Sequence, residues 1–304
     1  MQLIEKKLES ILQDLQLIKK QLKIVPDRDS TVKDFEASIS KYEEFARDEL
    51  GIGQGTINNQ KSAIFGFLNY SKGVINKESV KSYLDSNESE SWKSNQLKAL
   101  RRYVRDFLKL GNWINEFQFS TTKAKIKIIP TGEHLAKFVT ILPKQVQAIT
   151  LIMLSSGLRI SEVLSLRFID IANELHMINA TNIHKGKTKH SWISFMSQEA
   201  IDVLYEYLDE VDFDFKDDSK LFPVSARTVQ EEFKKASETI EIAINPHLLR
   251  TVFTEKCSQT GIENKYIDAF CGRVSQGVLA KHYTDYSPEA LRKQYDKVES
   301  YFTL

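Results

Sequence analysis

Residues 245–295 read NPHLLRTVFTEKCSQTGIENKYIDAFCGRVSQGVLAKHYTDYSPEALRKQY. Asn245 is a candidate N-cap and Pro246 is a first-turn proline, so the pattern predicts a helix that begins here. His247 and Arg250 then lie three residues apart, on one face of its opening turns. An imidazole and a guanidinium beside the free backbone N–H groups of a helix N-terminus form a site suited to a phosphate group.

Two segments upstream and a tyrosine downstream extend this pattern. The segment GLRISEVL places Arg159 at the start of a predicted helix whose apolar residues have helical spacing. Lys185 lies in the segment HKGKTK, between two strand-like runs at 175–181 and 191–195 that are expected to form a β-hairpin. Tyr283 follows downstream. Four elements in this order are far more specific than any one of them alone.

Together these elements resemble the signature of the tyrosine recombinases, or phage integrase family, and most closely that of integrases of archaeal viruses and plasmids of the fusellovirus type. The resemblance implies a mainly α fold with a small antiparallel β-hairpin or sheet. It also implies a site-specific DNA recombinase, or integrase, that cleaves and rejoins DNA through a 3′-phosphotyrosyl intermediate and a Holliday junction. Such an enzyme integrates or excises a viral or plasmid genome and requires no cofactor or metal.

The resemblance assigns a role to each matched residue. The expected catalytic residues are Arg159, Lys185, His247, Arg250, Arg273 and the nucleophile Tyr283. Arginine can donate a bidentate fork to the nonbridging phosphate oxygens, which lysine cannot reproduce. A phenol is ordinarily protonated at neutral pH. The nucleophile therefore needs nearby guanidinium groups that stabilise its phenolate form, and a base that accepts its proton. His247 is the candidate for that base. Lys185 is the expected general acid for the leaving 5′-oxygen.

Three positions leave alternatives open. Lys187 and Lys189 share the predicted turn with Lys185, so they are alternative candidates for the general acid. Both are also expected to contact DNA. Tyr286 and Tyr295 are rival nucleophiles. Where bacterial relatives usually have Gly-His, this chain has Gly-Arg at Arg273, a permanently charged group that can bind phosphate but cannot shuttle a proton.

The chain divides by pattern into four parts. The first has apolar residues at alternating steps of four and three, which predicts an oligomerising coiled coil or, alternatively, an amphipathic helix packed on its own domain. The second is helical throughout and resembles the core-binding domain of the family, and the third is a basic linker. The parts are the coiled coil 1–25, the helical core-binding DNA-binding domain 31–116, the linker 117–132 and the catalytic tyrosine recombinase domain 133–304.

Helices and DNA contacts are expected within these parts. In the linker, alternating lysines in an extended chain point to one side about 7 Å apart, close to the spacing of phosphates along a strand. The expected DNA-binding residues are Arg101, Arg102, Arg105, Lys123, Lys125, Lys127, Lys187 and Lys189. The predicted helices are 32–48, 54–70, 77–86, 91–109, 143–156, 198–210 and 226–240, and a further one starts at Ser287.

Composition restricts the function classes. The formal net charge is +1, so a chain that binds DNA must cluster its basic residues. Its two cysteines have no CxxC spacing, so no disulfide or zinc site is implied. Neither a signal peptide nor a run of 18 apolar residues is present, which indicates action in the host cytoplasm or nucleoid and no membrane partner.

The expected partners are double-stranded DNA attachment sites and further copies of the chain. A homotetramer is expected to assemble on DNA through the N-terminal coiled coil and the C-terminal helix, although that helix could instead pack on its own domain. Two other functions fit the same fold. One is a catalytically idle DNA-binding regulator, which the complete set of catalytic residues disfavours. The other is a type IB topoisomerase, which shares the chemistry but acts as a monomer.

Overall fold

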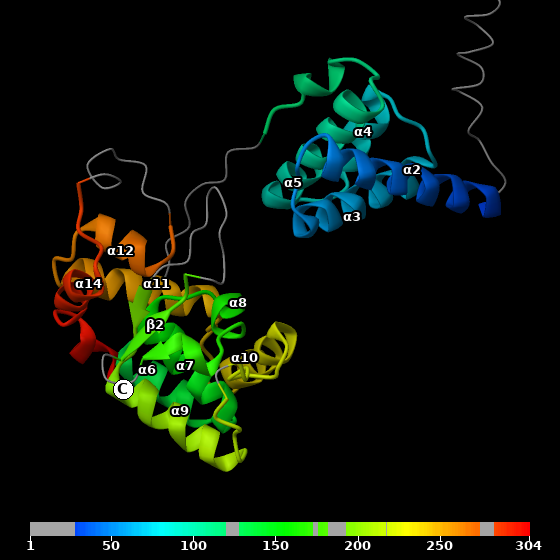
Figure 1. The fold of residues 1–304 in the computed structure, drawn as a ribbon. Helices are drawn as coiled ribbons and strands as arrows, with labels where there is room; N and C mark the ends of the chain where they lie inside the picture. Colours follow the sequence, from blue (N-terminus) through cyan, green and yellow to red (C-terminus); the bar gives the residue numbers. More distant parts are fainter. Residues whose placement is uncertain (1–27, 120–127, 173–175, 182–192, 217, 274–282) are drawn as a thin grey trace, which may run out of the picture. The chain divides into compact units, whose positions relative to one another are not determined.

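The computed structural model describes residues 28–119, 128–172, 176–181, 193–216, 218–273 and 283–304, and for 28–33 the backbone alone. Several predictions lie outside these ranges: the coiled coil 1–25 and the residues Lys123, Lys125, Lys127, Lys185, Lys187 and Lys189. The chain forms two compact units, Met1–Ile126 and Lys127–Leu304. Figure 1 shows the helices of each unit gathered around their own interior. No helix in the described ranges is long and apolar enough to span a bilayer.

The smaller unit is a bundle of α-helices, as the sequence predicts. Its helices are α2 (Arg28–Asp48), α3 (Gln54–Ser71), α4 (Lys77–Asp85), α5 (Glu90–Arg101) and the 3₁₀ turn η2 (Trp113–Glu116). One expectation is corrected: the helix predicted over 91–109 changes at Arg102 into the π-helical segment η1 (Arg102–Phe107). In this segment the rings of Tyr103 and Phe107 both pack on the buried ring of Tyr42, at 5.7 and 5.6 Å between centroids.

The larger unit is mainly helical with one small sheet. Its helices are α6 (Gly132–Thr140), α7 (Lys144–Ser156), α8 (Ile160–Val163), η3 (Phe168–Asp170), α9 (Gln198–Glu210), α10 (Ala226–Ile240), α11 (Pro246–Gln259), α12 (Asn264–Phe270), α14 (Pro288–Tyr295) and η5 (Glu299–Phe302). The strands are β1 (Ile171–Ala172), β2 (Met177–Asn179) and β3 (Ile193–Phe195). The predicted hairpin is therefore confirmed, and a short third strand extends it in the order β1-β2-β3, antiparallel throughout.

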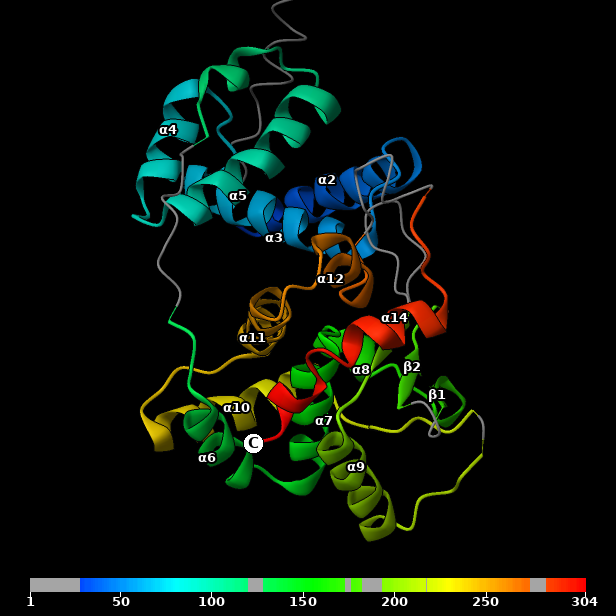
Figure 2. The ribbon, with the colours of Figure 1, turned by 90° about the vertical axis from the view of Figure 1, so that its left-hand side faces the viewer.

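Helix α7 is the centre of the larger unit, and Figure 2 shows α6, α9 and α11 around it. Its residues from 148 to 156 are all buried, which is typical of a helix covered all round rather than on one face. Gly157 ends it in the left-handed conformation (φ 69°). A Cβ at this position would also clash with the ring of Phe253, so only glycine fits. The chain therefore leaves α7 sharply, directly before Arg159.

The C-terminal apolar stripe packs on its own unit. Leu291, Tyr295, Val298 and Phe302 are all buried, and the ring of Phe302 stacks on that of Phe253 at 5.3 Å. Packing within the chain is the alternative that the sequence left open, and β3, α7 and α11 present the apolar surface that the stripe covers. A contact of this helix with a neighbouring protomer stays a prediction.

Candidate active site

A cavity of about 780 Å³ opens on the larger unit and contains four of the six predicted catalytic residues. Arg159, His247, Arg250 and Arg273 all line it. They come from three separate regions of the chain: the turn after α7, the start of α11, and the turn after α12. Sequence order alone suggested this grouping, and the tertiary structure brings the four side chains to one concave surface.

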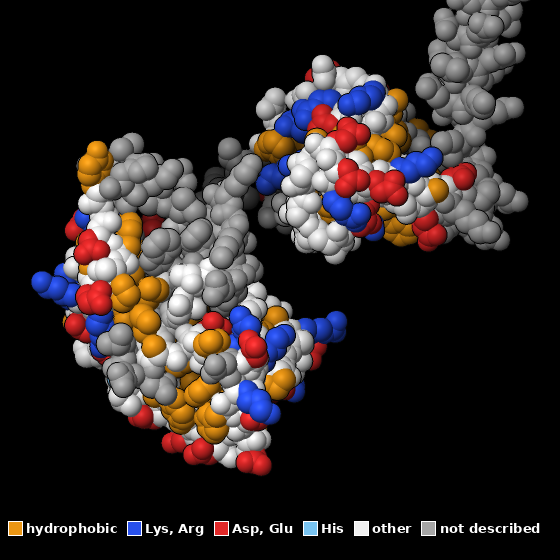
Figure 3. All heavy atoms as spheres, viewed as in Figure 1, with side chains coloured by type: hydrophobic (Ala, Val, Ile, Leu, Met, Phe, Trp, Pro, Cys, Tyr) orange, Lys and Arg blue, Asp and Glu red, His pale blue; other side chains and the backbone are white. Residues whose placement is uncertain are grey.

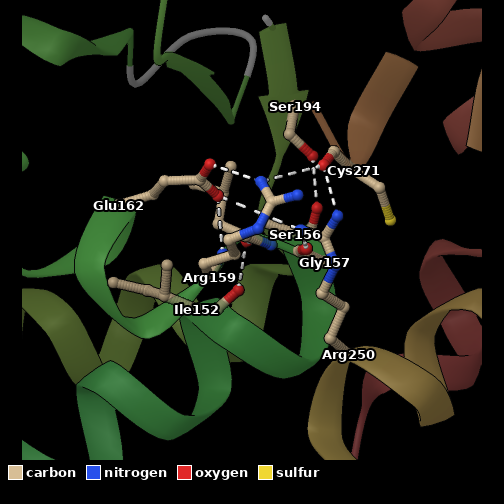
Figure 4. Close-up of polar contacts among 9 residues, drawn as sticks. Ile152, Ser156, Gly157, Arg159, Glu162, Ser194, Arg250 and Cys271 are labelled. Carbon is tan, nitrogen blue, oxygen red and sulfur yellow. Dashed lines mark hydrogen bonds and ion pairs between the residues drawn. The ribbon is translucent and has the colours of Figure 1, made fainter. Parts of the chain in front are cut away.

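Arg159 is fixed through its backbone and its side chain. It is the N-cap residue of the one-turn helix α8. Its backbone N–H donates to Oε2 of Glu162 at 2.7 Å, and its Nη1 donates to Oε1 of the same carboxylate at 2.7 Å and to the carbonyl oxygen of Cys271 at 3.5 Å (Figure 4). Among the described residues, Nε and Nη2 of Arg159 have no hydrogen-bond partner. These donors remain for an anion in the cavity.

The side chain of Arg250 is more deeply buried than that of Arg159. Asn245 caps α11 by accepting a hydrogen bond from the backbone N–H of Leu248 at 3.0 Å, which confirms the predicted helix start. The side chain of Arg250 is only 8% exposed. Its Nη1 donates to the carbonyl oxygen of Gly157 at 2.6 Å, and its Nη2 donates to that of Cys271. Burial lowers the pKa of the guanidinium below its ordinary value, but arginine stays charged at neutral pH.

Glu162 supplies the counter-charge for both arginines, and it is not among the site residues predicted from the sequence. It is fully buried, 2.7 Å from Arg159 and 3.9 Å from Arg250. Two guanidinium groups therefore share one carboxylate and one carbonyl, that of Cys271 (Figure 4). The cluster keeps an excess positive charge that a phosphate can neutralise. The i, i+3 spacing within GLRISEVL was the available signal.

Glu162→Gln keeps the size of this side chain but removes its charge. Leaving a buried charge without its partner costs about 3–5 kcal/mol. Misplacing an anion-binding donor slows a reaction by on the order of 10²-fold. We therefore expect a lower melting temperature and much slower DNA cleavage. The matched control is Glu133→Gln, which makes the same change in an exposed pair with Lys137. Equal melting temperatures and cleavage rates for the two variants would contradict the role of Glu162.

His247 and Arg273 lie at the more open part of the cavity. His247 is exposed in the first turn of α11. The side chain of Arg273 is 49% exposed, and its Nη1 lies 3.3 Å from Oδ1 of Asp268. Both side chains can therefore reach a ligand without moving the core. Gln230 and Lys234 of α10 also line the cavity, and no sequence motif distinguished them from other polar residues on an exposed helix face. Figure 3 shows lysine and arginine side chains over α10.

Tyr283 is described but does not line the cavity. Its side chain is 78% exposed, and the residues directly before it lie outside the described ranges. The structure separates the rival tyrosines by burial. Tyr295 is fully buried, its hydroxyl donates to the carbonyl oxygen of Ser155 at 2.9 Å, and burial raises its pKa well above the ordinary value. Tyr286 is half-buried, with its ring 6.1 Å from that of Tyr266. Tyr283 is the most accessible of the three.

The candidate DNA-binding arginines of the smaller unit differ in their contacts. Nη2 of Arg101 donates to the carbonyl oxygens of Asn115 and Phe117, and burial lowers the pKa of this guanidinium. Arg105 donates to both carboxylate oxygens of Asp106, at 2.6 and 3.0 Å. Within the described ranges Arg102 forms no hydrogen bond or salt bridge through its side chain. A phosphate contact by any of the three stays a prediction.

Known proteins resemble this chain in sequence and in fold. The family model described as "Phage integrase family" matches residues 131–290, more than half of the chain. The tyrosine recombinase XerA of Saccharolobus solfataricus is 26% identical over 275 residues, which cover 82% of this chain and 89% of the relative. XerA of Thermococcus onnurineus is 23% identical over 275 residues, covering 85% of this chain and 94% of the relative.

Two solved structures have the same fold. One is a λ integrase dimer bound to a COC′ core site, with a TM-score of 0.61 and 16% identity, covering 83% of this chain and 95% of that chain. The other is the Tn1549 transposon integrase in complex with transposon right end DNA, with a TM-score of 0.61 and 15% identity, covering 86% of this chain and 99% of that chain.

Proposed function

Because the chain belongs to the phage integrase family, we propose that it integrates or excises a viral or plasmid genome at double-stranded DNA attachment sites. The chain is a tyrosine site-specific recombinase. The observation that carries the proposal is the pair of guanidinium groups, Arg159 and Arg250, that meet at the carbonyl oxygen of Cys271 beside the cavity. This is an anion site fixed before any substrate arrives.

The proposed chemistry uses that site for the scissile phosphate. The free donors of Arg159 bind the nonbridging oxygens. Together with the positive charge of Arg250, they neutralise the negative charge that develops in the pentacoordinate transition state. Because backbone carbonyls and Glu162 already hold the guanidinium groups, little reorganisation is needed at the moment of reaction. Arg273, half-exposed at the rim, adds a third cation that a bound phosphate can attract from Asp268.

The covalent step is a transesterification. The hydroxyl oxygen of Tyr283 attacks phosphorus, His247 accepts the phenolic proton, and the bond from phosphorus to the 5′-oxygen breaks. Lys185 protonates that leaving oxygen. The 3′-phosphotyrosyl bond keeps the energy of the phosphodiester, so a 5′-hydroxyl from a partner duplex can reverse the attack. Two such rounds, through a Holliday junction, exchange all strands.

The proposed partners are DNA and further copies of the chain inside the host cell. The λ and Tn1549 structures are complexes with DNA, which supports a DNA substrate for this chain. A λ integrase tetramer bound to a Holliday junction has the same fold and supports a tetramer. Residues 1–25 and the C-terminal helix remain the proposed oligomerisation elements.

Covalent capture from a DNA pool tests this function with no chosen target sequence. The full chain is incubated with nicked duplexes that contain a randomised segment, in buffer with EDTA, and protein-bound DNA is recovered under denaturing conditions and sequenced. We expect repeated capture rounds to enrich one sequence class, with the DNA attached through its 3′-phosphate. Absence of any covalent product, while the chain still shifts duplex DNA in a native gel, would favour the idle DNA-binding regulator.

A further inference from the structure

The C-terminal end of α12 lies beside all three arginines of the cavity. Cys271 is the C-cap residue of this helix, and its carbonyl oxygen accepts hydrogen bonds from Arg159 and Arg250 (Figure 4). Arg273 follows two residues later and lines the same cavity. The last carbonyls of a helix carry partial negative charge, which favours nearby cations. The end of α12 therefore holds the three cations together.

Backbone geometry fixes the place of Arg273. Gly272 has a left-handed backbone, with φ at 56°, directly after the C-cap residue. Its N–H donates to the carbonyl oxygen of Ala269 at 2.9 Å, and the N–H of Arg273 donates to that of Asp268 at 2.8 Å. These two bonds form the Schellman motif, in which the side chains at the ends of the longer bond frequently pack together. The motif therefore places the side chain of Arg273 next to that of Asp268.

In this chain the contact is an ion pair, whereas an apolar contact usually accompanies the motif. Nη1 of Arg273 donates to Oδ1 of Asp268 at 3.3 Å. Within the described ranges, Nε and Nη2 of Arg273 form no hydrogen bond, so both remain for a ligand. Arg159 is held in a similar way, because Glu162 binds its Nη1 and leaves its other nitrogens to the cavity.

The stability of the helix does not explain the carboxylate of Asp268. It lies in the last turn of α12, where an anion faces the negative end of the helix dipole and is unfavourable. Both side chains of the ion pair are partly exposed, and exposed ion pairs contribute little to folding stability. The effect of the carboxylate on Arg273 is the better explanation for an acid at this place.

We propose that Asp268 is a positioning residue for Arg273 in the cleavage step. It holds one nitrogen of the guanidinium at the rim of the cavity and so sets the position from which the other two reach the scissile phosphate. Since an arginine does not give up its proton, Arg273 acts only through the placement of its charge. The inference rests on the proposed function.

A double-mutant cycle measures whether Asp268 acts through Arg273. Wild type, Asp268→Asn, Arg273→Gln and the double variant are compared in single-turnover cleavage of nicked duplex carrying the captured site, with protein in saturating excess. Residues coupled in one ion-pair network change each other's effect by about twofold to 10²-fold. We expect Asp268→Asn to cleave about tenfold more slowly than wild type, and to cause no further slowing in the Arg273→Gln background.

The same helix provides a matched control. Glu263→Gln also changes a carboxylate to an amide in an ion pair, here with Lys265 at 2.9 Å, and neither residue lines the cavity. This variant should cleave like wild type. The melting temperature of Asp268→Asn should equal or exceed that of wild type, because the change removes an anion from the negative end of α12. A lower melting temperature, with cleavage slowed equally in both backgrounds, would assign the carboxylate to the fold and overturn the proposal.

Three other outcomes of the cycle are decisive. The proposal is wrong if Asp268→Asn cleaves at the wild-type rate. It is also wrong if Asp268→Asn cleaves faster, because the carboxylate would then restrain Arg273 instead of placing it. Asp268→Glu keeps the charge on a longer side chain and should be slowed less than Asp268→Asn. Failure of wild type to cleave would instead contradict the proposed function, so the two failures are distinguishable.

Discussion

Tyr283→Phe is expected to bind duplex DNA like wild type and to form no covalent complex. The change removes one hydroxyl from a side chain that is 78% exposed, so folding should be unaffected. Removing the nucleophile of a covalent mechanism costs on the order of 10⁶-fold in rate. The measurement is a denaturing gel of nicked duplex carrying the captured site, incubated with each protein in EDTA, beside a native gel for binding.

The rival tyrosines serve as controls in the same assay. Tyr295→Phe should still form the complex, because that hydroxyl is buried and already donates to Ser155 O. Tyr286→Phe should also form it, since its ring packs on that of Tyr266 and is half-buried. If Tyr283→Phe forms the complex and Tyr286→Phe does not, Tyr286 is the nucleophile instead. A complex lost in no single variant would show that another group attacks.

Arg250→Lys is expected to lose cleavage almost completely, although it keeps the positive charge. The guanidinium donates to Gly157 O and Cys271 O at the same time, and one ammonium at the end of a flexible stem cannot reproduce that planar fork. Loss of one preorganised donor costs on the order of 10²–10³-fold in rate. Because Gly157 O loses the hydrogen bond from Arg250 and Cys271 O keeps only the 3.5 Å bond from Arg159, a lower melting temperature is expected as well.

Two further variants separate the effect of the positive charge from the effect on folding and the effect on the cleavage reaction. Arg227→Lys makes the same substitution at a side chain that is 87% exposed and paired with Glu231, and it should cleave like wild type. Arg159→Lys changes a side chain that is 26% exposed, so it should fold even if Arg250→Lys does not, and it should also cleave slowly. Wild-type cleavage rates in both Arg250→Lys and Arg159→Lys would show that the planar geometry of the guanidinium groups does not contribute to cleavage.

Local chemistry explains which structural predictions succeeded. Asn245 and Pro246 start α11 as expected, and Ser287 and Pro288 start α14, because a cap and a first-turn proline act within four residues of the chain. Gly157 ends α7 for an equally local reason, its left-handed backbone. The π-helical segment after Arg101 was not predictable in this way, since no glycine, proline or capping hydrogen bond marks its start.

The sequence by itself determined the chemical groups of the candidate site and their order, because residue type and helix starts are local properties. Only the tertiary structure decided how those groups are held. Arg250 meets Gly157 O across 93 positions of the chain. The approach of Glu162 to Arg250 and the contrast between buried Tyr295 and exposed Tyr283 arise in the same way. Burial and long-range hydrogen bonds depend on which elements pack together, and no spacing along the chain encodes that directly.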